Sequence, residues 1–149
     1  MLDCQDLGPV DITTPVQDMR KFGLIQVAGW IYTATWLHTF VERLPLGSGS
    51  RMSLIRVLTP GQEIPAHADG YLLKGVPQRR FLLPLITHPN AVMSWFTEDG
   101  VKESYHLLEG HLFEINYRKK HEVENHSPID RVHIQIDVLE DTSTHVTTD

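Results

Sequence analysis

The part of the chain after residue 50 is a succession of short strand-forming segments separated by turn residues. These segments are apolar or alternate in polarity and are rich in β-branched and aromatic residues, which predicts strands. We expect strands over 53–58, 80–87, 91–96, 101–107, 110–117, 121–125 and 132–138. Residues 97–100 predict a hairpin turn, with Gly100 at the position that needs a positive φ. Many short strands without long helices between them favour a closed or nearly closed β structure.

The first fifty residues differ in character and predict helices that pack outside this β structure. The segment 14–17 (TPVQ) fits a capping box, which predicts a short helix over 15–21 with Thr14 as its N-cap. Apolar side chains then recur at helical spacing, which predicts a second helix within 30–44 that ends before Pro45 and Gly47. Residues 31–33 also have strand propensity.

The length of 149 residues matches one domain. We expect a helical cover over 1–50, the β structure over 51–140 and a flexible tail over 141–149, where apolar residues are few. A chain of this size buries enough surface to fold without disulfides. The single cysteine, Cys4, excludes an internal disulfide framework and a zinc site built from several thiolates.

Charge narrows the classes of partner. The chain has 13 basic and 19 acidic residues and a formal net charge of −6. Broad attraction to nucleic acid or to an anionic membrane is therefore disfavoured, and we expect a small-molecule or peptide substrate. No apolar run approaches the ~20 residues of a membrane span, and the first twenty residues contain several aspartates, unlike a signal peptide. We expect a soluble, cytoplasmic protein.

Nine histidines prompt a search for metal ligands. In the segment 64–70 (IPAHADG), His67 and Asp69 are two residues apart, so in an extended backbone both side chains point to one side. An imidazole and a carboxylate aimed at one point are suited to a divalent metal. The alternative is a turn in which Asp69 caps a backbone amide after Pro65.

A third ligand is available downstream in the segment 120–125 (KHEVEN). His121 completes a set of two histidines and one carboxylate, which is typical of non-haem Fe(II) oxygenases, although zinc accepts it too. The alternatives are a surface role for His121 beside the basic residues 118–120, and His126 as the third ligand. His126 lies in a turn signal, so we favour His121.

The last predicted strand has one apolar and one polar row. The apolar row is Val132, Ile134, Ile136 and Val138, and the polar row is Arg131, His133, Gln135 and Asp137. An arginine directed into a β barrel is costly unless an anion meets it. Because a guanidinium pairs with a carboxylate in bidentate fashion, Arg131 predicts a small dicarboxylate co-substrate that binds the metal by its other end.

Four segments, in this order, resemble the aspartyl/asparaginyl β-hydroxylase-like group of Fe(II)/2-oxoglutarate dioxygenases, which also includes bacterial proline hydroxylases. The segments are LTPGQEIPAHAD, RRFLLPLIT, LLEGHLFEINYRKKHEVEN and RVHIQID. The resemblance implies a mainly β fold, a double-stranded β-helix of jelly-roll or cupin-like type, with helices on one outer face. It implies His67, Asp69 and His121 as Fe(II) ligands. It also implies Arg131 as the partner of the distal carboxylate of 2-oxoglutarate, with His133 as a second contact.

Arg80 aligns with an arginine of the resembling proteins, which implies a contact to the substrate, with Arg79 as the alternative. Some members carry the first iron histidine two residues after that arginine, where this chain has Leu82, so here the ligand role falls to His67. The implied activity is Fe(II)- and 2-oxoglutarate-dependent hydroxylation of an amino acid or an amino-acid side chain. The alternatives are a cupin-type metalloenzyme without 2-oxoglutarate and a non-catalytic β-barrel binding module.

Overall fold

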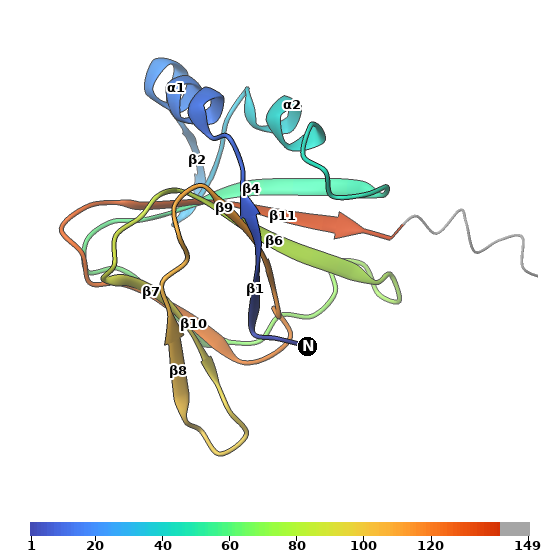
Figure 1. The fold of residues 1–149 in the computed structure, drawn as a ribbon, viewed down its shortest axis with the longest axis vertical. Helices are drawn as coiled ribbons and strands as arrows, with labels where there is room; N and C mark the ends of the chain where they lie inside the picture. The colour runs from blue at the N-terminus through green and yellow to red at the C-terminus, as the bar shows by residue number, and fades with distance from the viewer. Residues whose placement is uncertain (141–149) are drawn as a thin grey trace, which may run out of the picture.

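The computed structural model describes residues 1–140, which form two antiparallel β-sheets with a helical layer on one side (Figure 1). The larger sheet has seven strands in the order β1-β9-β6-β11-β4-β3-β2. Their bounds are β1 Cys4–Pro9, β2 Ile25–Ala28, β3 Ile31–Thr33, β4 Ser50–Leu58, β6 Gln78–Ile86, β9 His111–Ile115 and β11 Arg131–Leu139. The smaller sheet has four strands in the order β5-β10-β7-β8. Their bounds are β5 Glu63–His67, β7 Ala91–Phe96, β8 Lys102–Tyr105 and β10 His121–Asn125.

From β4 onward the chain passes back and forth between the two sheets. Strands β4, β6, β9 and β11 belong to the larger sheet, and β5, β7, β8 and β10 belong to the smaller one. This winding is that of a double-stranded β-helix, and the helices lie on the outer face of the larger sheet (Figure 1). The predicted fold class is therefore confirmed.

The two rows of β11 explain why both of its faces are buried. Ile134 and Ile136 of the apolar row pack with Trp36 and Val41 in a core between the larger sheet and the helical layer. The polar row occupies the opposite face of the strand, toward the smaller sheet. A second apolar core lies between the sheets, and its largest fully buried side chain is Trp95. The interior between the sheets thus holds both an apolar core and a row of polar side chains.

The first predicted helix is present as α1 (Thr13–Phe22), but its predicted cap is wrong. Thr14 lies inside the helix, and the N-cap position is occupied by Ile12 without a side-chain hydrogen bond. The carboxylate of Asp11 instead accepts from the backbone N–H of Thr13 at 2.9 Å. The side chain of Asp11, just before the helix, therefore satisfies one of the free amides of the first turn.

The second predicted helix is only partly correct. Helix α2 covers Leu37–Glu42, whereas Ile31–Thr33 forms the short strand β3. Strand β3 pairs with β4, with Ile31 opposite Arg56, and with β2 on its other side. Strand pairing at the sheet margin therefore overrides the helical spacing in this segment, in agreement with the strand propensity of residues 31–33.

The first fifty residues thus add strands as well as helices to the fold. Strand β1 pairs with β9 at one margin of the larger sheet, and β2 and β3 form the other margin. The strands predicted from residue 53 onward are all present, and Gly100 has the expected positive φ of 79°. The predicted tail, 141–149, lies outside the described residues.

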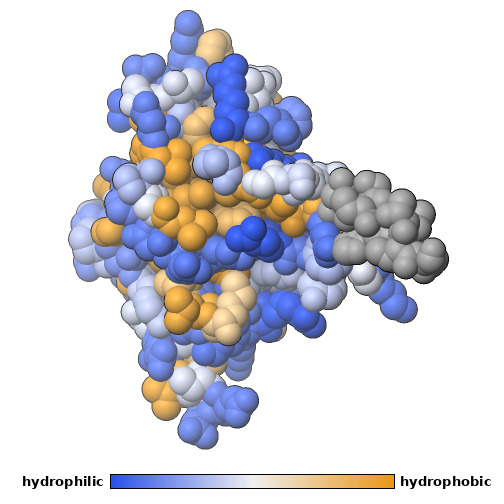
Figure 2. Space-filling model, turned by 45° about the vertical axis from the view of Figure 1, so that its right-hand side comes forward, coloured by the Kyte–Doolittle hydropathy of each residue, from blue (hydrophilic) through white to orange (hydrophobic). Residues whose placement is uncertain are grey.

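In the space-filling view, hydrophobic side chains gather across the middle of the face shown, below the helical layer (Figure 2). Over residues 1–140, none of the helices is both long enough and apolar enough to span a membrane.

Candidate active site

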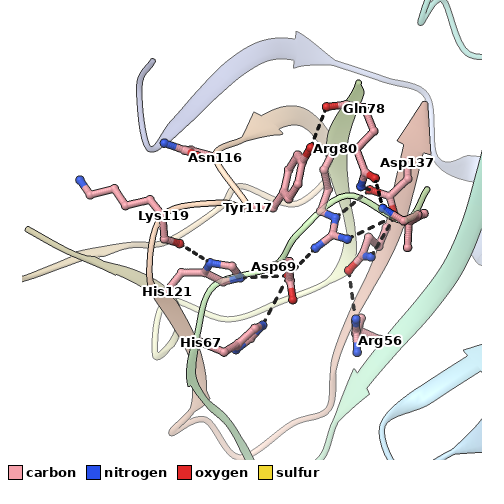
Figure 3. A network of polar contacts seen from close by, with 12 residues as sticks. Arg56, His67, Asp69, Gln78, Arg80, Asn116, Tyr117, Lys119, His121 and Asp137 are labelled. Carbon is pink, nitrogen blue, oxygen red and sulfur yellow. Dashed lines mark hydrogen bonds and ion pairs between the residues drawn. The ribbon is translucent and has the colours of Figure 1, made fainter. Parts of the chain in front are cut away.

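The three predicted metal ligands lie together at the ends of neighbouring strands of the smaller sheet (Figure 3). His67 ends β5 and His121 begins β10, and the two residues are direct partners in the antiparallel register. Asp69 follows in the loop after β5, where its backbone N–H donates to the carbonyl of Tyr117 at 2.9 Å. Strand register and one backbone hydrogen bond therefore position all three side chains.

The donor atoms of these residues converge on one point. Asp69 Oδ2 lies 3.5 Å from His67 Nε2 and 3.7 Å from His121 Nε2. One ligand atom from each residue lies within 4.8 Å of the other two. Metal–ligand distances of about 2.0–2.2 Å are compatible with donor atoms at these separations. The geometry is that of a preformed three-ligand site.

Both histidines are held in the tautomer that a metal requires. Nδ1 of His67 lies 2.7 Å from the carbonyl oxygen of Pro65, and Nδ1 of His121 lies 2.7 Å from that of Lys119. A carbonyl oxygen only accepts, so each Nδ1 carries the proton and each Nε2 has a free lone pair directed toward Asp69. Burial lowers the pKa of His121, which keeps its ring neutral. This donor set fits Fe(II), and it also fits zinc.

Arg80 holds Asp69 in place from the larger sheet. Its Nη1 donates to Asp69 Oδ2 at 2.7 Å, and its Nε donates to Asp137 Oδ1 at 2.7 Å. The guanidinium also lies 4.9 Å from the ring centroid of Tyr117, whose hydroxyl donates to the carbonyl of Gln78 at 2.9 Å. Arg80 is buried and fully engaged by two carboxylates. Its predicted contact with the substrate stays a prediction, and the contacts observed are those of a residue that positions Asp69.

A cavity of about 320 Å³ lies beside the three donor atoms. From the larger sheet it is lined by the polar residues Arg56, Arg131 and Gln135. Its apolar walls include Trp30, Ile64, Leu82, Met93, Ile115 and Val123. The cavity therefore joins the three donor atoms at one corner to two guanidinium groups in the opposite sheet, through mainly apolar surroundings.

Arg131 begins β11 and is only 3% exposed. Among residues 1–140, no carboxylate lies within ion-pair distance of its guanidinium. Burial, and then the positive charge of Arg56, lower the pKa of Arg131 to about 9. A buried guanidinium without an anion is unfavourable, and this one lines the cavity beside the three donor atoms.

The remaining candidate residues lie in different surroundings. His133 is 2% exposed, and neither ring nitrogen has a hydrogen-bond partner in the described part of the chain. Burial, and then the charge of Arg131, lower the pKa of His133 well below its usual value, so the ring is neutral. His133 is not among the residues that line the cavity, and its contact with a co-substrate stays a prediction. His126 is exposed and lies 2.9 Å from Glu124 Oε2, outside the group of three ligands.

Sequence reasoning missed the roles of Arg56 and Asp137. Arg56 lies in β4, between the apolar residues Ile55 and Val57, and its Nε donates to Gln135 Oε1 at 3.2 Å. The signal was present in the pattern, because a lone arginine within an apolar strand must either reach solvent or find a buried partner. The sequence assigns Asp137 to the polar row of β11, but it does not reveal that Asp137 pairs with Arg80, because that contact depends on the register of β6 with β11.

Fold and site together define a double-stranded β-helix that carries two histidines and one carboxylate at the mouth of a cationic cavity. Residues 31–141 match the family model of aspartyl/asparaginyl β-hydroxylase, and the chain belongs to this family. No curated protein is similar enough in sequence to be matched.

Solved structures share the fold at low sequence identity. A prolyl-4-hydroxylase from Pseudomonas putida aligns with a TM-score of 0.63 at 15% identity, over 92% of this chain and 91% of its own. AviO1 from Streptomyces viridochromogenes aligns with a TM-score of 0.63 at 14% identity, over 93% and 90%. An oxidoreductase of the 2OG-Fe(II) oxygenase family from Burkholderia pseudomallei aligns with a TM-score of 0.55 at 11% identity, over 77% and 65%. These similarities concern the fold.

Proposed function

We propose that the protein is an Fe(II)- and 2-oxoglutarate-dependent hydroxylase that acts on an amino acid or an amino-acid side chain. His67, Asp69 and His121 hold the metal, and Arg131 binds the distal carboxylate of 2-oxoglutarate. Three protein ligands leave the other coordination positions open for the co-substrate and for oxygen. A bound Fe(II) would supply oxidation of a C–H bond to an alcohol at the expense of O₂, with one oxygen atom entering the product and the other entering succinate as 2-oxoglutarate loses CO₂.

The observation that carries the proposal is the unpaired Arg131 in the wall of the cavity that the metal ligands also line. A metal site alone would suit a cupin-type enzyme or a binding module, neither of which needs a buried guanidinium at this place. A dicarboxylate fits both the metal site and Arg131, because one carboxylate would reach the metal and the other would form two parallel hydrogen bonds with the guanidinium.

The chain's own residues have three further tasks in this activity. The Nδ1–H of His67 and of His121 donates to a backbone carbonyl, which fixes each ring and directs its Nε2 to the metal. Arg80 fixes the carboxylate of Asp69 through a hydrogen bond of 2.7 Å. The apolar cavity walls exclude water, which protects a reactive centre from side reactions.

Anaerobic addition of Fe(II) and 2-oxoglutarate tests the co-substrate assignment directly. We expect a weak visible charge-transfer band with the wild-type protein and its loss in His121→Ala. Arg79→Met is the matched control, because Arg79 pairs with Glu114 at the surface and does not line the cavity. A wild-type protein that binds Fe(II) but gives no band on addition of 2-oxoglutarate would contradict the proposal.

The substrate class is tested by succinate release over a panel of free amino acids, peptides and nucleosides. We expect release above the uncoupled background with amino acids or peptides. Stimulation by nucleosides alone would overturn the proposed substrate class while leaving the co-substrate assignment intact.

A further inference from the structure

Arg56 places a second unpaired guanidinium in the wall of the cavity. In the register of β4 and β11 it lies opposite His133, so its side chain shares the inner face of the larger sheet with the polar row of β11. Its Nε donates to Gln135 Oε1 at 3.2 Å. Residues 1–140 provide no carboxylate within ion-pair distance of Arg56, and its two terminal nitrogens have no acceptor in this part of the chain.

A chain of hydrogen bonds holds Arg56 in this position. Gln135, which accepts from Arg56, donates through Nε2 to Asp137 Oδ2 at 3.4 Å. Asp137 in turn accepts from Nε and Nη2 of Arg80, at 2.7 and 3.4 Å. In Figure 3, Arg56 lies at one end of this network, and it lines the same cavity as the three metal ligands. A donor held in advance loses little conformational freedom when a ligand binds, which favours recognition.

The charges around the cavity do not balance when metal and co-substrate are counted. The protein contributes three positive charges here, from Arg56, Arg80 and Arg131, and two negative charges, from Asp69 and Asp137. A divalent metal adds two positive charges and 2-oxoglutarate adds two negative ones, which leaves one positive charge in excess. Arg80 is paired with both aspartates, and the co-substrate pairs with Arg131, so the excess lies at Arg56. Arginine does not lose its proton under ordinary conditions, so only another anion removes this excess.

We propose that Arg56 binds a carboxylate carried by the substrate. The charge count rests on the proposed function, because it includes 2-oxoglutarate. The carboxylate has two sources of the same chemistry, the α-carboxylate of a free amino acid and the acidic side chain of a peptide residue. A substrate without such a group leaves the Arg56 guanidinium without an anion in a partly desolvated cavity, which disfavours its binding.

The test measures ligand binding rather than turnover. Wild-type protein is loaded with Fe(II) and 2-oxoglutarate without oxygen and titrated calorimetrically with three probes. N-acetylglycine offers an α-carboxylate, N-acetylaspartate α-amide offers a side-chain carboxylate, and N-acetylglycinamide is the neutral control. We expect one of the two acids to bind at least about tenfold more tightly than the neutral amide, and the acid that does so identifies the source of the carboxylate.

Variants assign that preference to one side chain. Arg56→Met should abolish the preference for the acid, Arg56→Lys should retain part of it, and Arg79→Met should leave it unchanged. Arg56→Gln, which keeps a polar group beside Gln135, replaces Arg56→Met if the latter does not give a folded protein. The affinity for 2-oxoglutarate should change by less than about threefold in the Arg56 variants, because Arg131 remains.

Three results would overturn the proposal: equal binding of both acids and the amide, an acid preference that survives in Arg56→Met, or a loss of 2-oxoglutarate affinity in Arg56→Met as large as in Arg131→Met. The last result would mean that Arg56 shares the co-substrate carboxylate. A wild-type protein that does not bind 2-oxoglutarate refutes the proposed function instead. In that case the same acids are titrated into metal-loaded protein, where an acid preference that depends on Arg56 still supports the anion site.

Discussion

Replacing Arg131 with methionine should have opposite effects on the ligand-free protein and on co-substrate binding. Methionine has a similar length and no charge, so it fills the same space between the sheets without a guanidinium. In the ligand-free protein the change removes a buried cation that has no anionic partner among residues 1–140. With 2-oxoglutarate, the change removes the group that we propose as the partner of its distal carboxylate.

The magnitude follows from the surroundings of Arg131. Burial lowers the pKa of Arg131 to about 9, so keeping the charge inside the fold costs on the order of a few kcal/mol. The unfolded arginine keeps its proton to a higher pH than the folded one, which releases it near pH 9. This cost is therefore constant at neutral pH and is relieved only as the pH rises above about 9. We therefore expect ligand-free Arg131→Met to gain about 1–4 kcal/mol in its free energy of unfolding. Loss of one partner of a buried charge pair costs about 2–5 kcal/mol, or about 30-fold to several-thousand-fold in affinity for 2-oxoglutarate.

Two measurements on the same preparation check this expectation. Denaturant unfolding without ligands gives the change in stability, and calorimetric titration with 2-oxoglutarate after anaerobic Fe(II) loading gives the change in affinity. Fe(II) affinity, measured in parallel, should be unchanged because no metal ligand is altered. Arg131→Lys should recover only part of the loss, since an ammonium does not reproduce the two parallel hydrogen bonds. Unchanged 2-oxoglutarate affinity in folded, Fe(II)-binding Arg131→Met protein would refute the co-substrate assignment.

Three further predictions concern the metal site and the fold. His67→Ala and His121→Ala should each abolish Fe(II) binding in a calorimetric titration, whereas Asp69→Ala should retain part of it because water can occupy the vacated position; full binding by either histidine variant would contradict the ligand assignment. Burial lowers the pKa of His121, so protons should compete with Fe(II) for this ligand only below pH ~6.5. Fe(II) titrations between pH 5 and 8 measure this competition, and a loss of Fe(II) affinity that begins above pH ~6.5 would contradict the prediction. Gly49 has a φ of +116° and an added Cβ would lie 2.2 Å from the carbonyl oxygen of Leu139, so Gly49→Ala should lower the free energy of unfolding by about 1–3 kcal/mol or more; wild-type stability in this variant would refute the predicted clash.

The β portion of the fold was predictable because its signals are local. Alternation over 132–138 and the hairpin turn at Gly100 follow from side-chain periodicity and from backbone sterics, which need no knowledge of neighbouring strands. Strand β3 shows the limit of this approach, because Ile31–Thr33 is held as a strand by its pairing with β2 and β4, which the sequence alone does not reveal. The extended segment that ends at His67 was recognised through its metal-binding pattern, although its pairing with β10 comes only from the structure.

The site was predictable to the extent that its residues are close in sequence or chemically conspicuous. His67 and Asp69 form a recognisable pair, and Arg131 stands out as a charge within a buried strand. The partners of Arg80 were not accessible in the same way. Asp137 and Asp69 reach its guanidinium from opposite sides, through the register of β6 with β11 and through the loop after β5. Such contacts depend on register across several strands, which the sequence does not specify residue by residue.

The pairing of Arg80 with two carboxylates has a consequence for the metal site. Asp69 offers Arg80 the same oxygen, Oδ2, that faces the free nitrogens of both histidines. A metal at this point and the guanidinium therefore draw on one carboxylate oxygen. Without a second partner, Arg80 would lose part of its stabilisation when a metal arrives, and metal binding would be weakened by that amount. Asp137, with Oδ1 at 2.7 Å from Arg80 Nε, keeps the guanidinium paired throughout, so the carboxylate of Asp69 is oriented by Arg80 and remains available to the metal.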